Sequence, residues 1–299
     1  MGYVATIGFF DGVHTGHRFV LQELCRTAVQ RNMHSMVVTF RNHPRKVLEH
    51  DFSAQLLTSP EERVRLLTHY GVEKVEMLSF DEVRDYTAAE FMRWLHDKKE
   101  VELLLMGYDH RFGSDGLRIF SDYEAASRGT GVQLLQLPEY AEDKVRVSST
   151  MCRRLLQQGA IEEANRLLGY PYMLSGMVGH GREIGRTIGF PTANLLPGFS
   201  DKLLPGEGVY IASALADGRS YRALVNIGTN PTVQASVCSI EVYLYDFSGD
   251  LYGKQMEIRL LHYLREEHRF ASLEELRQQI EADKRALLAF SEDTCTQTD

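Results

Sequence analysis

The chain has 299 residues, of which 43% are hydrophobic and 25% charged, and its formal net charge is -8. This length favours two domains, and this composition excludes a disordered chain. The acidic balance argues against nucleic acid as the main partner, because proteins that bind the phosphate backbone are normally basic. A small anionic ligand stays possible, since a local group of N–H donors binds phosphate whatever the net charge.

The cysteines are scattered along the chain without a CxxC pair, a spacing that suits neither a zinc site nor a disulfide framework. No apolar run is long enough to cross a bilayer, and no signal-peptide pattern is evident. We therefore expect a cytoplasmic protein with reduced thiols and no membrane association. The sequence points to no obligatory protein partner.

In the first half, short apolar runs alternate with helical patterns. The candidate strands are Val4–Gly8, Ser35–Phe40, Lys74–Ser79, Leu103–Gly107 and Gln133–Leu137, and the candidate helices lie at about 16–31, 60–70, 87–98 and 119–129. Strands separated by helices predict a Rossmann-like α/β fold, in which helices cover both faces of a parallel sheet. Ligands of such sheets bind beyond the carboxyl ends of the strands, so the loops there are expected to carry the chemistry.

After about residue 170, glycine and proline punctuate short β-rich runs, at Tyr172–Val178, Val209–Ala216, Arg222–Ile227, Ser239–Tyr245 and Met256–Leu264. Such spacing predicts a small antiparallel barrel or sandwich. An amphipathic helix follows, from about Ser272 to Phe290. We place the boundary after two helical patterns, at Ser149–Gln158 and Ile161–Leu168, so the predicted domains are residues 1–169 and 170–299.

The segment from Gly8 to His17 lies between the first strand and the first helix. Its glycines allow close approach of the backbone to a ligand, and a helix N-terminus offers N–H groups and a positive dipole end to a phosphate. His14 and His17, spaced as HxGH, can add donors or positive charge. Nucleotidyl transfer needs in-line positioning and charge stabilisation, which such a group can supply. Taken alone, HxGH could equally be a satisfied histidine pair in a glycine turn.

This segment resembles the nucleotidyltransferase superfamily that carries HxGH, and its longer GxFDGVH form resembles bacterial FAD synthetases. Three further segments are similar to that family: Thr39–Pro44 to TFxxHP, Gly107–Gly113 to GxDxxFG, and Ser148–Arg153 to SSTxIR. Two departures are Cys152, where the family prefers isoleucine, and a loop after Gly113 that lacks the expected basic residues. The resemblance implies that ATP is bound by Gly8, Phe10, Asp11, His14, His17, Gly107, Asp109, Ser148, Ser149, Thr150 and Arg153. Singly, Asp109 could be a turn residue and either serine a helix cap.

In the second half, a glycine-rich bend leads to the sequence PTAN at residues 191–194. Thr192 and Asn194 would share a face if this segment is extended, and their hydroxyl and amide oxygens suit Mg²⁺. Read alone, PTAN is only a turn. The run GRxxGFPTAN is closely similar to riboflavin kinases, as are Asn226–Thr232, the segment that begins at Glu241, and Leu264–Phe270, which matches LRxExxF.

That second resemblance implies a role for each matching residue. Glu241 would be the general base that accepts a proton from the ribityl hydroxyl. Thr192 and Asn194 would hold the metal. ATP would be bound by Gly179, Gly181, Arg186, Thr192, Asn194 and Tyr252, and the flavin by Arg265, His268 and Phe270. Alternatively, Glu241 could be a carboxylate at a strand edge that faces water. The three flavin residues could each simply cover the start of the last helix.

Together the two resemblances imply a bifunctional riboflavin kinase and FMN adenylyltransferase. Riboflavin and ATP would give FMN, and FMN and a second ATP would give FAD, both with Mg²⁺. The catalytic residues would be Glu241, His14 and His17. The alternatives are an enzyme in which adenylyl transfer is impaired, a flavin-binding carrier or regulator without turnover, and a nucleic-acid binder, which the net charge disfavours.

Overall fold

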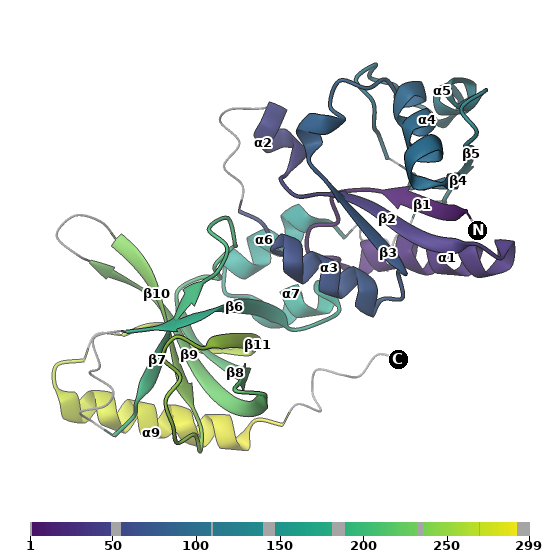
Figure 1. Cartoon of the computed structure of the whole chain (residues 1–299). Coiled ribbons are helices and arrows are strands. Elements are labelled where there is room, and N and C mark those ends of the chain that lie inside the picture. Colours follow the sequence, from purple (N-terminus) through teal and green to yellow (C-terminus); the bar gives the residue numbers. More distant parts are fainter. Residues whose placement is uncertain are drawn as a thin grey trace. The chain divides into compact units, whose positions relative to one another are not determined.

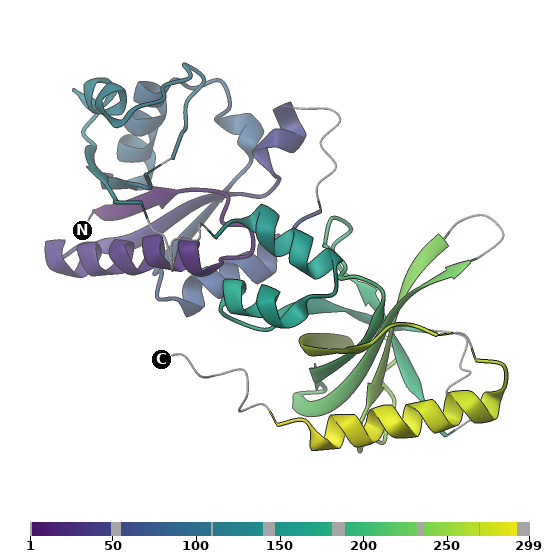
Figure 2. The same ribbon diagram turned by 180° about the vertical axis from the view of Figure 1, so that it is seen from behind.

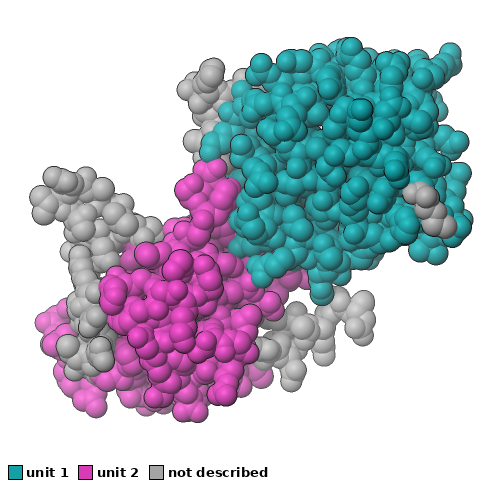
Figure 3. Space-filling view, in the orientation of Figure 1, with its two compact units in different colours: residues 1–149 teal, residues 150–299 magenta. Residues whose placement is uncertain are grey.

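The computed structural model describes residues 2–48, 55–108, 110–139, 147–180, 189–231, 236–268 and 270–291, with the backbone alone at residues 48, 230, 231 and 236–238. The chain divides into two compact units, Met1–Ser149 and Thr150–Asp299, which are coloured separately in Figure 3. Within the described ranges, no helix is long and apolar enough to cross a membrane.

The first unit is built on a parallel sheet in the strand order β3-β2-β1-β4-β5. Its strands are β1 (Tyr3–Ile7), β2 (His34–Phe40), β3 (Lys74–Leu78), β4 (Val101–Met106) and β5 (Gln133–Gln136). All neighbouring strands run parallel, as helical crossovers between them require. The predicted α/β fold is confirmed, with strand bounds close to those expected.

Helices cover both faces of this sheet (Figures 1 and 2). One face carries α1 (Thr15–Arg31) and α3 (Pro60–His69), and the other carries α4 (Ala88–Lys99) and α5 (Phe120–Ser127). Successive strand residues point to opposite faces, so Ala5 and Ile7 of β1 pack in one cluster with Phe91 and Leu95 of α4. The sequence pattern did not predict the short helix α2 (Pro44–Leu48) or the 3-10 turn η1 (Phe80–Glu82).

The strand order reverses at β1, which has β2 on one side and β4 on the other. In open α/β sheets, ligands bind in the crevice outside the carboxyl ends of the strands at this point. The loop after β1 starts at Gly8, and the loop after β4 starts at Gly107. Both loops therefore lie at the edge where the sequence predicts the chemistry.

The second unit contains a closed antiparallel barrel in the order β10-β7-β6-β11-β8-β9. Its strands are β6 (Tyr172–Gly179), β7 (Thr192–Pro197), β8 (Gly208–Ala216), β9 (Arg219–Pro231), β10 (Ser236–Leu244) and β11 (Gln255–Arg265). Closure decides between the barrel and the sandwich that the sequence allowed. The interpretation of PTAN as a turn is wrong, because residues 192–194 pair with residues 241–243 of β10 and so belong to a strand.

Two helices, α6 (Ser149–Gln157) and α7 (Ile161–Leu168), precede the barrel. The Asn165 side chain of α7 donates to the carbonyl oxygen of Leu260 at 2.8 Å and accepts from the backbone N–H of Tyr172 at 2.7 Å. These bonds tie α7 to β11 and to the start of β6. The domain boundary after Gly169 stays a prediction.

The last helix, α9 (Leu273–Ala289), packs on the outer face of the barrel (Figure 1). Its buried Leu287 forms a cluster with Ile211 of β8 and Leu224 of β9, against which Tyr243 of β10 also packs. Because alternate strand residues share a face, Glu241, two positions before Tyr243, also lies on the outer face.

Candidate functional site

The loop between β1 and α1 has a strained backbone. Phe10, Gly12 and Val13 all have left-handed φ angles, of 53°, 80° and 38°. This region is unusual for a β-branched residue such as Val13, and strain of this kind clusters at functional sites. A Cβ atom at Gly8 would lie 2.8 Å from the Phe10 ring, so a larger residue there would have to displace that ring.

Asp11 fixes this loop to the segment before α3. Its buried carboxylate accepts hydrogen bonds from the backbone N–H groups of Leu57 at 3.1 Å and Thr58 at 3.0 Å, and from the Thr58 hydroxyl at 3.1 Å. The hydroxyl of Ser149 donates to the Asp11 carbonyl oxygen at 2.9 Å. The fold thus brings together Asp11 and Ser149, two residues that the sequence assigned to ATP from separate motifs.

His14 and His17 occupy the start of α1. His14 is the N-cap, and its Nδ1 accepts from the backbone N–H of His17 at 3.3 Å. The two rings stack with centroids 3.7 Å apart. The pKa of His17 lies well below its ordinary value, first because of burial and then because His14 and Arg63 are near. His17 is therefore neutral at pH 7 in the free protein, and it offers hydrogen bonding in place of the positive charge that the sequence allowed.

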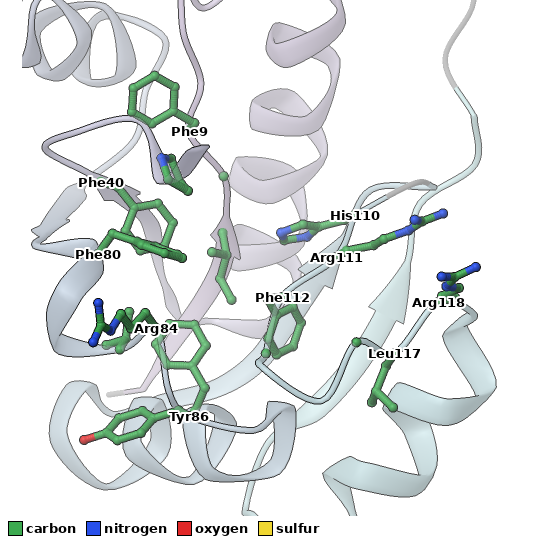
Figure 4. A pocket seen from close by; sticks show the side chains of 17 residues that line it. Phe9, Phe40, Phe80, Arg84, Tyr86, His110, Arg111, Phe112, Leu117 and Arg118 are labelled. Atoms are coloured by element: carbon green, nitrogen blue, oxygen red, sulfur yellow. The ribbon is translucent and has the colours of Figure 1, made fainter. Parts of the chain in front are cut away.

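A pocket of about 550 Å³ opens in the first unit, and Figure 4 shows its two walls. Its aromatic lining residues are Phe9, Phe40, Phe80, Tyr86, Phe91 and Phe112. Arg84, Arg111 and Arg118 also line it. Aromatic walls with cations nearby suit a planar aromatic ligand that carries a negative charge. Phe80, Tyr86 and Phe91 lie outside every sequence motif, so sequence reasoning missed them.

The side of the pocket that carries Phe112 is held in place by Tyr123, a fully buried residue of α5. The Tyr123 hydroxyl accepts from the backbone N–H of Phe112 at 3.0 Å and donates to the Phe112 carbonyl oxygen, also at 3.0 Å. His110 lines the same pocket, and burial lowers its pKa to about 4. Phe112 is thus positioned by a hydrogen-bonded side chain that no motif contained.

Other residues of the predicted adenylyltransferase site stand near the ends of elements. Gly107 follows β4 directly, and Ser148 directly precedes α6. Asp109 lies outside the described residues. Thr150 and Arg153 belong to α6. The ATP contacts expected of these residues stay predictions.

In the barrel, the predicted base and the predicted metal ligands come together. Asn194 on β7 pairs with Glu241 on β10, and Thr192 pairs with Tyr243. The Thr192 hydroxyl donates to Glu241 Oε2 at 3.4 Å. A carboxylate, a hydroxyl and an amide oxygen are hard donors of the type that Mg²⁺ prefers. The described residues contain no group of three His, Cys, Asp or Glu side chains that could hold a metal. A magnesium ion at such a site would keep most of its ligands as water and phosphate oxygens.

The strand register extends this group around the barrel. Glu241 also pairs with Asn226 on β9, Asn226 pairs with Val209 on β8, and Val209 pairs with Arg265 on β11. On the other side, Asn194 pairs with Gly179 on β6. Residues in register share a face. The row therefore begins at Gly179, which is predicted to bind ATP, and ends at Arg265, which is predicted to bind the flavin. The metal candidate Asn194 and the base candidate Glu241 lie between them.

At the ATP end of this row, Tyr252 stacks on His180, which follows β6, with ring centroids 4.0 Å apart. The backbone N–H of Gly253 donates to the Val178 carbonyl oxygen at 2.9 Å. Gly179 and Tyr252, both predicted to bind ATP, therefore lie close together. Gly181 and Arg186 lie outside the described residues.

At the flavin end, the Arg265 guanidinium is held by Asp283 of α9 through Nη2–Oδ2 at 2.8 Å and two bonds from Nε. Its Cζ also lies 6.0 Å from the centroid of the Phe270 ring. His268 is exposed. Arg265 thus links β11 to the last helix, and the flavin contacts expected of these residues stay predictions.

Two family models match the chain, FAD synthetase over residues 1–151 and riboflavin kinase over residues 168–290. The bifunctional riboflavin kinase/FMN adenylyltransferase of Escherichia coli strain K12 is 39% identical, over 95% of this chain and 91% of that protein. The protein of the same description from Pseudomonas fluorescens is 38% identical, over 97% of this chain and 93% of that protein. A crystal structure described as a macrolide-efflux protein from Streptococcus pneumoniae has a TM-score of 0.89 and 30% identity, over 97% of this chain and 95% of that one. The chain belongs to the bifunctional riboflavin kinase/FMN adenylyltransferase family.

Among the positions that depart from the family's motifs, the loop after Gly113 is largely exposed. Two others are packed, namely Cys152 and Tyr243, where riboflavin kinases more usually have histidine. Cys152 of α6 is fully buried. Tyr243 makes an edge-on contact with Phe190, with ring centroids 5.6 Å apart, and packs against the α9 cluster. In this member of the riboflavin kinase/FMN adenylyltransferase family, both side chains therefore contribute to packing.

Proposed function

We propose that this chain makes flavin coenzymes at two sites, phosphorylating riboflavin in the second unit and adenylylating FMN in the first. One observation carries the proposal above the others. Thr192 and Glu241 are 49 positions apart in the sequence, yet the β7–β10 pairing brings them within 3.4 Å. The substrates would be riboflavin, FMN and ATP, and the compartment the cytoplasm.

In the kinase reaction, the ribityl 5′-hydroxyl oxygen bonds to the γ-phosphorus of ATP while the bond to ADP breaks. Glu241 accepts the proton that this hydroxyl loses. Thr192 and Asn194 would hold Mg²⁺, which neutralises charge on the phosphate oxygens when bound. Gly179, Gly181, Arg186 and Tyr252 are the proposed ATP residues, and Arg265, His268 and Phe270 the proposed flavin residues.

In the adenylyl transfer, a phosphate oxygen of FMN bonds to the α-phosphorus of ATP, and pyrophosphate leaves. This step needs positioning and charge stabilisation more than covalent help. The N-terminus of α1 offers backbone N–H groups and a positive dipole end. His14 and the neutral ring of His17 add hydrogen bonding there. The aromatic pocket would take the flavin ring.

Among the other residues proposed to bind ATP in the first unit, contacts support a role for Asp11 and Ser149, and family resemblance supports the rest. Asp11 would act through the shape of its loop, because its carboxylate already binds the backbone before α3. Ser149 shares that arrangement through its bond to the Asp11 carbonyl oxygen. Roles for the others rest on family resemblance, and these residues are Gly8, Phe10, Gly107, Asp109, Ser148, Thr150 and Arg153.

Chromatography of flavins after incubation with riboflavin, ATP and Mg²⁺ tests the proposal. The unchanged protein is expected to form FMN and then FAD. Glu241→Gln should slow FMN formation by about 100-fold or more, while supplied FMN still becomes FAD. His17→Asn should do the reverse, so that FMN accumulates. Each retained reaction thus shows that the substitution leaves the other unit active, and far-UV circular dichroism checks that the substituted unit is folded. FMN formation at the unchanged rate in the Glu241→Gln protein would contradict the kinase site, and bound flavin without ATP consumption would favour a carrier.

A further inference from the structure

Arg63 of α3 is a fully buried cation in the first unit, with 0% of its surface exposed. Charged side chains are rarely buried to this extent, because removing a charge from water is costly. Burial lowers the pKa of Arg63 to about 10, and the nearby carboxylates of Asp11 and Glu61 oppose that shift. Arg63 is therefore still charged at pH 7.

The hydrogen bonds of Arg63 all come from one nitrogen. Nη1 donates to the carbonyl oxygens of Phe9 at 3.1 Å and Phe40 at 2.7 Å, and to the Thr39 hydroxyl at 3.3 Å. Nε and Nη2 are buried and have no hydrogen-bond partner among the described residues. These two nitrogens are also shielded from solvent, so Arg63 does not contact a ligand directly in this conformation.

Two of the three residues that Arg63 binds line the aromatic pocket. Phe9 follows β1 and Phe40 ends β2, and both residues line the pocket (Figure 4). The Arg63 Cζ also lies 4.0 Å from the centroid of the Phe9 ring. A planar guanidinium can donate hydrogen bonds in its plane while its flat face stacks on a ring, whereas an ammonium group has no flat face to stack.

The position of Arg63 is fixed from the other side by the start of α3. Ser59 caps this helix in a reciprocal capping box with Glu62. The segment just before the cap binds the Asp11 carboxylate through the backbone of Leu57 and Thr58. The loop after β1 is therefore held at two points. The segment before α3 binds its residue Asp11, and Arg63 within α3 binds its residue Phe9.

We propose that Arg63 is a positioning residue for FMN adenylylation, which sets the aromatic walls at Phe9 and Phe40 and the conformation of the loop that leads to His14. This inference rests on the proposed function, because it takes the aromatic pocket as the FMN site. It accounts for a buried cation that forms no ion pair with any described carboxylate. Removing Arg63 would loosen Phe9 and Phe40 at once.

The test compares Arg63→Lys, Arg63→Met and the control Arg65→Met, whose side chain lies on the exposed face of the same helix. The measured quantities are KM for FMN and kcat for FAD formation, with the riboflavin kinase rate of the same preparations alongside. We expect Arg63→Met to raise KM for FMN by about tenfold or more, since small misplacements in a site have effects of this size. Arg63→Lys should recover part of the loss, because an ammonium can still donate to the two carbonyl groups. The kinase rate should not change, and Arg65→Met should match the unchanged protein.

A second measurement separates this inference from the proposed function. FMN binding is followed by flavin fluorescence, and Phe112→Ala identifies the part of the signal that belongs to the pocket. Weaker binding to that pocket in both Arg63 variants supports the inference even if the unchanged protein forms no FAD, an outcome that would refute the proposed function alone. Equal KM values and equal affinities in all three Arg63 forms would overturn the inference. So would a loss confined to kcat, because that loss would mean only a smaller folded fraction.

Discussion

The ion pair between Arg265 and Asp283 allows a quantitative prediction for the Asp283→Ala variant. The side chains are 18% and 5% exposed, so both are largely shielded from water. Asp283 accepts from Arg265 Nη2 at 2.8 Å and from Gln279 Nε2 at 2.8 Å. The substitution removes all of these bonds and leaves the guanidinium without its carboxylate.

Removing one partner of a buried pair destabilises a protein by about 3–5 kcal/mol. Arg265 keeps one bond, from Nη1 to the Glu266 carbonyl oxygen at 2.9 Å, and part of it reaches water. We therefore expect a loss of stability at the lower end of this range, about 3 kcal/mol. For a unit of this size, that corresponds to a fall in Tm of about 6–12 °C.

The assay is urea unfolding followed by far-UV circular dichroism and by loss of riboflavin kinase activity, which reports the second unit separately. Glu281→Ala is the matched control, because this residue is exposed on the same helix. The double variant Arg265→Met, Asp283→Leu should recover much of the lost stability, since it leaves no unpaired charge; for this variant circular dichroism is the readout, because Arg265 is a proposed flavin residue. A change of less than about 1 kcal/mol in the free energy of unfolding of Asp283→Ala would refute the reasoning.

Three further predictions concern the first unit. Ser59→Ala removes the cap of α3 and should lower the free energy of unfolding by about 1 kcal/mol in urea titrations; an unchanged midpoint would contradict this. Tyr123→Phe leaves the Phe112 N–H without its acceptor, so it should cost about 1–3 kcal/mol and raise KM for FMN, and an unchanged KM would mean that Phe112 holds its position without the hydroxyl. Burial keeps His17 and His110 neutral in the folded state, with the pKa of His110 at about 4. The unfolded state binds their protons first, so stability present above pH of about 6.5 should fall as the pH drops, by at most about 1.4 kcal/mol per pH unit for each residue. Equal slopes in unchanged protein and His110→Gln would exclude His110 as a contributor.

The sequence alone was enough for features that depend on neighbouring residues. The helix expected at about 60–70 corresponds to α3, whose start is set by the Ser59 cap and by Pro60, because a cap and a proline act on the backbone beside them. The spacing of Thr192 and Asn194 predicted that they share a face in an extended segment, and β7 confirms it. The alternation of strands and helices predicted the parallel sheet, since such connections permit little else.

The tertiary structure decided what depends on distant pairing. Residues 192–194 read as a turn until β10 supplies their hydrogen-bond partners. Phe80 and Tyr86 join the pocket only because β3 is next to β2 and so brings the segment that follows it beside Phe40. Arg63 looks like an ordinary helical surface residue in the sequence, yet packing of α3 on the sheet buries it completely. Strand register and helix packing bring together residues that are far apart in the chain. A local sequence pattern does not specify which residues these will be.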